Sequence, residues 1–128
     1  MYIILLCLYL HRYIYICLGV EEIHALLDRV MKMNNCTFIP GSGEQAQALL
    51  TAAKNGAKPV KNNISGIQKQ PYFLLASENE TYLDLRRADV YISGHQIGSF
   101  GIVHPTVLAA FGIDYPCSVL ELNLELFL

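Results

Sequence analysis

The sequence predicts an α+β domain in which an antiparallel sheet is flanked by helices. Three observations support this fold class. Residues 21–34 have the apolar spacing of an amphipathic helix. From residue 71 onward, short apolar and alternating stretches separated by turns are typical of strands, with one short helical stretch near residue 105. Because helices and strands occupy separate blocks of the chain, strands joined by hairpins are favoured over a parallel sheet.

Composition limits the class of protein further. The 128 residues suffice for one domain, and the formal net charge of -2 gives no global positive field for a nucleic-acid backbone. Any contact with RNA would need a local basic patch or a partner subunit. The four cysteines are widely spaced and form no C-x-x-C pair, which argues against a zinc ribbon or a disulfide-rich secreted fold.

The apolar N-terminal segment, residues 1–18, is treated apart from the expected module of residues 19–128. Its length is near that of a membrane span, but His11 and Arg12 fall in its middle, where charge is costly in hydrocarbon. A secretory signal would carry its positive charge first and end in a small-residue cleavage site, and neither is present. Tyr13–Ile16 consists of β-forming residues. A strand or an unstructured artefact is favoured over a membrane anchor, and an anchor over a signal peptide.

The first predicted helix, residues 21–34, has one apolar face. That face consists of residues at helical offsets: Ile23, Leu26, Leu27, Val30 and Met31. Glu21 near the start and Lys32 near the end suit the helix dipole. The stretch therefore predicts an amphipathic helix.

Residues 35–70 are expected to be a polar loop or insertion that contains one further helix. Ser42 and Gln45 have the spacing of a capping box, and residues 44–55 are rich in helix formers. Gly56 fits the C-terminal stop of this helix. The remainder is rich in Asn, Gly, Lys and Pro, which predicts a solvated surface loop.

A hairpin is predicted over residues 88–103. Val90 and Ile92 alternate with polar residues, the stretch "SGHQ" reads as a turn, and "IGSFGIV" returns as the partner strand. Gly98 and Gly101 inside that strand indicate bulges or close backbone approach.

The C-terminal stretch predicts a short helix and a last strand. Pro105 stands where the first residue of a helix would be, and Gly112 ends that helix. From residue 117 to the end of the chain, leucines alternate with polar residues such as Glu121. This alternation predicts a half-buried strand with one polar face.

No catalytic, cofactor-binding or metal-binding constellation emerges from the residues alone. His104 with Cys117 or Asp114 would suit nucleophilic catalysis, but no nucleophile elbow accompanies them, and a His before Pro is more often a cap or packing residue. The acidic residues of the last strand suit a hard cation, but a solvent-exposed face is the simpler interpretation. Arg86 and Arg87 suit a phosphate or an acidic partner, and as strand neighbours they point to opposite faces.

Two separated stretches carry a resemblance to a known family. Residues 98–121 combine a Gly-x-Phe-Gly strand, a His-Pro pair, a Val-Leu helix, a Phe-x-Ile turn and a Ser-x-x-Glu strand. Residues 19–31 read Gly-x-Glu-x-x-His-x-Leu-Leu-Asp-Arg-x-Met. In this order they resemble the C-terminal part of the β subunit of cytosolic phenylalanine–tRNA ligase, of the eukaryotic and archaeal kind. The matching positions include Gly19, His24, Asp28, Arg29, Gly98, Gly101, His104, Pro105 and Glu121. Where the family carries Pro-Gly-Arg, this chain has Asp84, Leu85 and Arg86, so the sharp turn there is expected to be altered.

The resemblance implies a partial module like the class II aminoacyl-tRNA synthetase fold, without catalytic residues. It implies a non-catalytic structural part of a cytoplasmic ligase that attaches phenylalanine to tRNA-Phe. This part would pack with the catalytic α subunit in an α2β2 assembly and contact tRNA through the complex. ATP and Mg²⁺ belong to the whole enzyme, and the family's magnesium carboxylates lie upstream of the matched stretches, so none carries over. The alternative is a small membrane-tethered α+β binding domain, and a free-standing metal or thiol enzyme has the least support.

Overall fold

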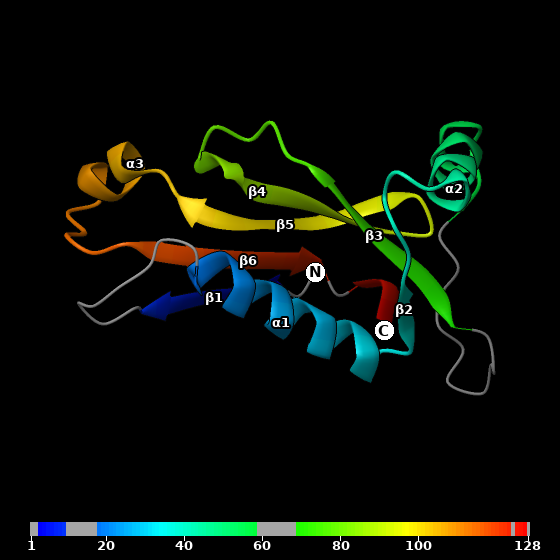
Figure 1. Cartoon of the computed structure of the whole chain (residues 1–128), viewed down its shortest axis with the longest axis horizontal. Helices are drawn as coiled ribbons and strands as arrows, with labels where there is room; N and C mark the ends of the chain where they lie inside the picture. The colour runs from blue at the N-terminus through cyan, green and yellow to red at the C-terminus, as the bar shows by residue number, and fades with distance from the viewer. Residues whose placement is uncertain (1–2, 10–17, 59–68, 124, 128) are drawn as a thin grey trace.

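The computed structural model describes residues 3–9, 18–58, 69–123 and 125–127. Within them, six strands form one sheet in the order β1-β6-β5-β4-β3-β2 (Figure 1). In chain order the elements are β1 (Ile3–Tyr9), α1 (Leu18–Met33), β2 (Cys36–Phe38), α2 (Glu44–Lys54), β3 (Gln70–Ala76), β4 (Tyr82–Ile92), β5 (His95–Val103), α3 (Pro105–Ala110), β6 (Cys117–Asn123) and the 3-10 helix η1 (Glu125–Phe127). The predicted α+β class is confirmed.

The sheet is antiparallel except at one edge. The pairs β1–β6, β6–β5, β5–β4 and β4–β3 are antiparallel, whereas β2 runs parallel to β3. The prediction of a surface loop is therefore wrong for Cys36–Phe38. A strand of three residues is too short to show an alternating pattern, and α2 supplies the crossover connection that a parallel pair needs.

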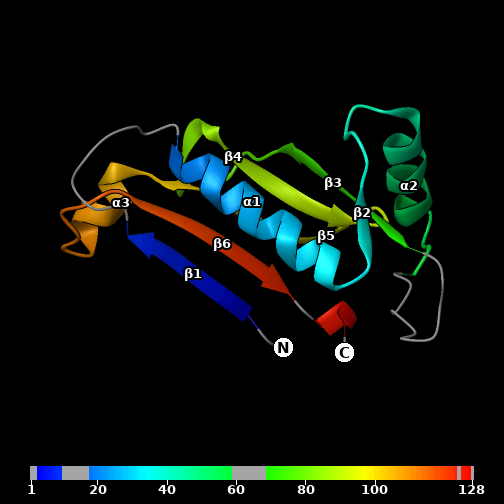
Figure 2. The same ribbon diagram turned by 60° about the horizontal axis from the view of Figure 1, so that its bottom comes forward.

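Helix α1 covers one face of the sheet, crossing it at an angle (Figures 1 and 2). Ile23, Leu27 and Met31 on its predicted apolar stripe are fully buried. They pack against buried side chains of five strands: Cys36, Tyr72, Val90, Ile92, Ile97, Phe100, Leu120 and Leu122. Each such side chain contributes roughly 1.5–3 kcal/mol when it leaves water, so this interface is the main core of the module.

Helices α2 and α3 lie near opposite ends of the sheet, on the side away from α1 in Figure 1. Leu108 of α3 packs into a second cluster with Tyr82, Val103 and Cys117. At the other end, a Cβ added to Gly94 would lie 2.3 Å from the carbonyl oxygen of Leu49 in α2. The hairpin turn before β5 therefore needs a glycine.

The ends of α2 only partly match the sequence prediction. The capping box of Ser42 and Gln45 is wrong, because Gly43 is the N-cap and no side chain caps the helix. The stop at Gly56 is confirmed, since this residue follows the C-cap Asn55 with a left-handed φ of 90°.

Strand β6 is internal to the sheet and shorter than predicted. Leu120 and Leu122 are buried while Glu121 is exposed, which confirms the alternation. The strand ends at Asn123, whose Oδ1 accepts a hydrogen bond from the Glu125 N–H (3.0 Å) at the start of η1. The expectation of a strand to the end of the chain is wrong because this side-chain turn stops the ladder.

The N-terminal segment contributes a strand to the same sheet. β1 pairs with β6 along all of its seven residues, from Ile3 opposite Asn123 to Tyr9 opposite Cys117. The β-forming stretch Tyr13–Ile16 lies outside the described residues. In the part of the chain that is described, no helix is long and apolar enough to span a membrane.

Candidate functional site

Three groups of contacts hold the module together, and the first two contain residues shared with the resembling family. The first group holds α1 against the sheet. Asp28 on α1 accepts a hydrogen bond from the Tyr72 hydroxyl of β3 at 2.6 Å, and His24 Nε2 lies 3.6 Å from the same carboxylate oxygen. The His24 ring stacks on Phe100 of β5, with ring centroids 5.8 Å apart. His24 and Asp28, one helical turn apart, thus hold α1 against β3 and β5 through polar and aromatic contacts.

The surroundings of this group favour the protonated forms of Tyr72 and of the neighbouring Cys36. Burial, followed by the hydrogen bond to Asp28, raises the pKa of Tyr72 well above its ordinary value. Burial also raises the pKa of the nearby Cys36 thiol to about 11, and its Sγ donates to the Asn34 carbonyl oxygen at 3.6 Å. A thiol of this kind is a core residue rather than a nucleophile, since reactivity needs a thiolate. Gly19 is buried at the start of α1 and Arg29 is exposed.

The second group joins β5 to α3 and β6. His104 is the N-cap of α3, with Nδ1 accepting a hydrogen bond from the Thr106 N–H at 3.2 Å, and Pro105 is the first helical residue. The cap expected from the His-Pro pair is therefore confirmed. The backbone N–H of His104 donates to the Thr81 carbonyl oxygen at 2.8 Å, which ties this junction to the connection before β4.

The glycines of β5 permit close contact with both neighbouring strands. A Cβ on Gly98 would lie 2.0 Å from the carbonyl oxygen of Glu121 in β6, and one on Gly101 would lie 2.7 Å from that of Arg86 in β4. Such approaches exclude any side chain, so the predicted close backbone contact is confirmed at both positions. The Glu121 side chain itself is exposed, while Arg86 is partly buried.

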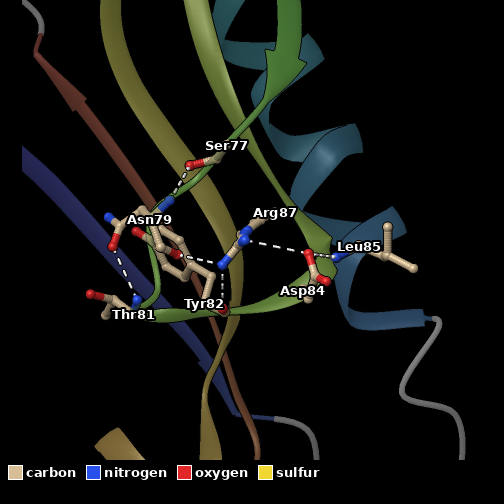
Figure 3. Close-up of polar contacts among 7 residues, drawn as sticks. All are labelled: Ser77, Asn79, Thr81, Tyr82, Asp84, Leu85 and Arg87. Carbon is tan, nitrogen blue, oxygen red and sulfur yellow. Dashed lines mark hydrogen bonds and ion pairs between the residues drawn. The ribbon is translucent and has the colours of Figure 1, made fainter.

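The third group is centred on Arg87 and orders the connection between β3 and β4 (Figure 3). Its Nη1 donates to the carbonyl oxygens of Asn79 (3.0 Å) and Tyr82 (3.2 Å), and its Nη2 lies 3.3 Å from Asp84 Oδ1. The side chain is only 16% exposed, and its Nε is buried with no hydrogen-bond partner among the described residues. Arg87 therefore acts as a clamp within the chain rather than as a free phosphate ligand.

The turn beside this clamp keeps an unusual backbone conformation. Leu85 has a φ of 59°, in the left-handed region, and Asp84 Oδ1 accepts its N–H at 3.0 Å. The Leu85 side chain is 92% exposed and points away from the cluster (Figure 3). Where the resemblance expects an altered turn in place of Pro-Gly-Arg, this chain therefore places a leucine in a backbone conformation that strains an L-residue. Sequence reasoning missed the role of Arg87, whose only signal was a charge next to an alternating strand.

The other candidate chemistry finds no support in these contacts. Cys117 is buried, and its Sγ donates to the carbonyl oxygen of Tyr115 at 3.7 Å. Among the described residues, no group of three or more His, Cys, Asp or Glu side chains is placed to hold a metal ion. His24, Asp28 and His104 instead hold α1 against the sheet or cap α3, and Gly98 and Gly101 let strands approach closely.

These contacts define the class of protein as an α+β scaffold module. Comparison with known families gives the particular one: the family model described as "Phenylalanyl tRNA synthetase beta chain CLM domain" matches residues 19–124. The match spans α1 through β6, the same elements that the three groups of contacts hold together. The chain belongs to the phenylalanyl-tRNA synthetase β chain family.

Individual relatives agree with this assignment. The cytoplasmic phenylalanine–tRNA ligase β subunit of Arabidopsis thaliana is 34% identical over 110 residues, covering 86% of this chain and 15% of the plant protein. The β subunit of Drosophila melanogaster is 33% identical over 109 residues, covering 85% of this chain and 14% of the fly protein. That of Methanosarcina acetivorans is 43% identical over 55 residues, covering 43% of this chain and 10% of the archaeal protein. The chain thus spans about one seventh of the length of its eukaryotic relatives.

Proposed function

We propose that this chain is a non-catalytic structural part of phenylalanine–tRNA ligase, the cytoplasmic enzyme that attaches phenylalanine to tRNA-Phe at the expense of ATP. In this proposal it is a partial class II synthetase-like module that packs with the catalytic α subunit in an α2β2 assembly. The observation that carries the proposal is the use of the family residues. His24, Asp28 and His104 contact other parts of the same chain, and Gly98 and Gly101 allow strands to approach closely.

The states of the polar side chains in this module support a structural rather than a catalytic role. Burial raises the pKa of the Tyr72 hydroxyl and of the Cys36 thiol, which favours their neutral forms, and Arg87 donates to backbone carbonyl groups. These side chains therefore stabilise the fold of the module, and their states do not suit proton transfer or nucleophilic attack. ATP and Mg²⁺ would be bound elsewhere in the enzyme, and tRNA would be met through the complex, which suits a chain with a net charge of -2.

Co-expression with the α subunit of phenylalanine–tRNA ligase from the same organism tests the proposal. We expect the full chain to co-purify with a tagged α subunit in a fixed ratio, and an unrelated α+β domain of similar size, expressed in the same way, to be absent. Failure of this chain to co-elute would refute the assembly role.

Aminoacylation assays test the other half of the proposal. The purified chain with phenylalanine, ATP, Mg²⁺ and tRNA-Phe should form no phenylalanyl-tRNA. Activity above that of a blank from mock-transformed cells, in the absence of the α subunit, would show that the chain is catalytic.

A further inference from the structure

On its outer edge, β1 pairs with no other strand in the described part of the chain. β1 is the last strand of the sheet, and in the described part of the chain no helix or strand lies beyond it (Figure 2). It uses one side of its backbone to pair with β6 over seven residues. In an antiparallel ladder, consecutive residues turn their N–H and C=O groups to opposite sides, so about half of the β1 groups face outward. Those groups offer a template for another strand.

The sequence of β1 lacks the features that usually protect such an edge. Ile3–Tyr9 reads "IILLCLY" and contains no charge, proline or glycine. Natural edge strands are commonly blocked by lysine, proline or a bulge, because an unprotected edge pairs with other chains. The seven β1–β6 pairs run in unbroken register, so no bulge bends this edge away.

The opposite edge of the sheet is much less able to pair. β2 has only three residues, and the chain leaves it towards α2 at once. Two long open edges on one molecule would allow head-to-tail addition without end. One long edge and one short edge instead favour a contact in which the same surface meets itself, and such a contact closes after two copies.

We propose that two copies of this chain associate through β1, antiparallel to each other, to form one continuous sheet with six strands from each copy. A pairing centred on Leu6 uses the whole strand, since it places Ile3 of one copy opposite Tyr9 of the other. The strand carries no charge, so no like charges oppose each other across the two-fold axis. This contact uses residues that precede the family match at residue 19, and it is therefore separate from the proposed role in the ligase.

Light scattering after size exclusion, performed on the full chain over a range of concentrations, measures the assembly. The expected mass is twice the 14.3 kDa of one chain. A monomer at every concentration, or a distribution of larger oligomers, would overturn the proposal.

Two neighbouring proline substitutions separate the open edge from the β6 pairing. Because consecutive N–H groups point in opposite directions, one of Leu5→Pro and Leu6→Pro removes a bond to β6 and the other removes a bond across the edge. One variant should therefore be a folded monomer whose unfolding midpoint does not depend on protein concentration. The other should lose the stability that the β1–β6 pairing provides. Lys58→Pro, at an exposed position outside the elements, is the control and should remain dimeric. Retention of the dimer by both β1 variants contradicts the inference.

A cross-linking experiment tests the register even if both proline variants fail to fold. In a Cys7→Ser background, Leu6→Cys places two thiols directly opposite each other across the two-fold axis, whereas Ile3→Cys places them far apart. Mild oxidation with copper phenanthroline should give a covalent dimer of the first variant and not of the second. The absence of a covalent dimer from the Leu6→Cys variant, or equal yields from both variants, would overturn the pairing.

Discussion

Replacing Leu85 with glycine should stabilise the protein, although it removes a large apolar side chain. Leu85 holds a φ of 59°, and the left-handed region costs an L-residue roughly 1–2 kcal/mol. The side chain is 92% exposed, so truncation forfeits less than about 0.3 kcal/mol of burial. Glycine adds about 0.5–1 kcal/mol of unfolded-state entropy to the cost of folding. The balance is a gain of about 0.5 kcal/mol in the free energy of unfolding.

Urea denaturation followed by circular dichroism measures this gain, with thermal unfolding as a second readout. We expect the Leu85→Gly variant to unfold at higher urea with an unchanged m-value, and its Tm to rise by roughly 2–4 °C. Ala48→Gly is the matched control, because Ala48 is exposed on α2 and glycine there should cost about 0.5–1 kcal/mol. If Leu85→Gly is no more stable than the wild type, the strain argument for this turn is wrong.

Three further predictions follow from the contacts of the module. Gly98→Ala should cost roughly 3 kcal/mol in urea denaturation, because its Cβ would meet a carbonyl oxygen at 2.0 Å. Gly112→Ala, in open space with a φ of 68°, should cost about 1 kcal/mol, and similar losses at both sites would count against the close strand approach. His104→Ala should lower the free energy of unfolding by about 1 kcal/mol, because α3 loses its N-cap. His104→Asn should recover most of this loss, and an Asn variant as unstable as the Ala variant would contradict the capping role. Folding raises the pKa of Tyr72, so the contribution of this residue to stability is complete below its unfolded pKa of about 10 and declines as pH rises above it. From pH 8 to pH 11, denaturation midpoints should therefore fall less steeply for Tyr72→Phe than for the wild type. Equal slopes would refute the link between Tyr72 ionisation and stability.

The sequence predicted those elements whose pattern is local. The apolar stripe of α1 repeats over three turns, and the alternation of β6 places Leu120 and Leu122 inside. The cap at His104 also needs only neighbouring residues, since a His-Pro pair supplies the acceptor and the fixed φ of the first helical residue. The glycines of β5 predict bulges or close backbone approach from the sequence, and the structure shows the close approach.

Prediction from the sequence failed where the pattern of neighbouring residues does not match the contacts that the folded chain makes. Ser42 and Gln45 have the letters of a capping box, but the chain starts α2 at Gly43, so the letters fall out of phase with the helix. The sequence suggested Arg87 as a ligand for phosphate or an acidic partner, yet its guanidinium donates to carbonyl groups five and eight residues earlier in the chain. A periodicity argument does not see such a contact because it depends on how β3 and β4 are joined.

By itself, the sequence determined the α+β class, the helix that covers the sheet and the two motifs that tie the chain to the phenylalanyl-tRNA synthetase β chain family. These features depend on side-chain periodicity and on residues that act within a turn of their own position. Only the tertiary structure decided that β2 is parallel, that β6 lies inside the sheet and that Ile3–Tyr9 forms its edge. The physical reason is that strand neighbours are chosen by backbone hydrogen bonds between distant segments, and those bonds leave no mark on the spacing of side chains.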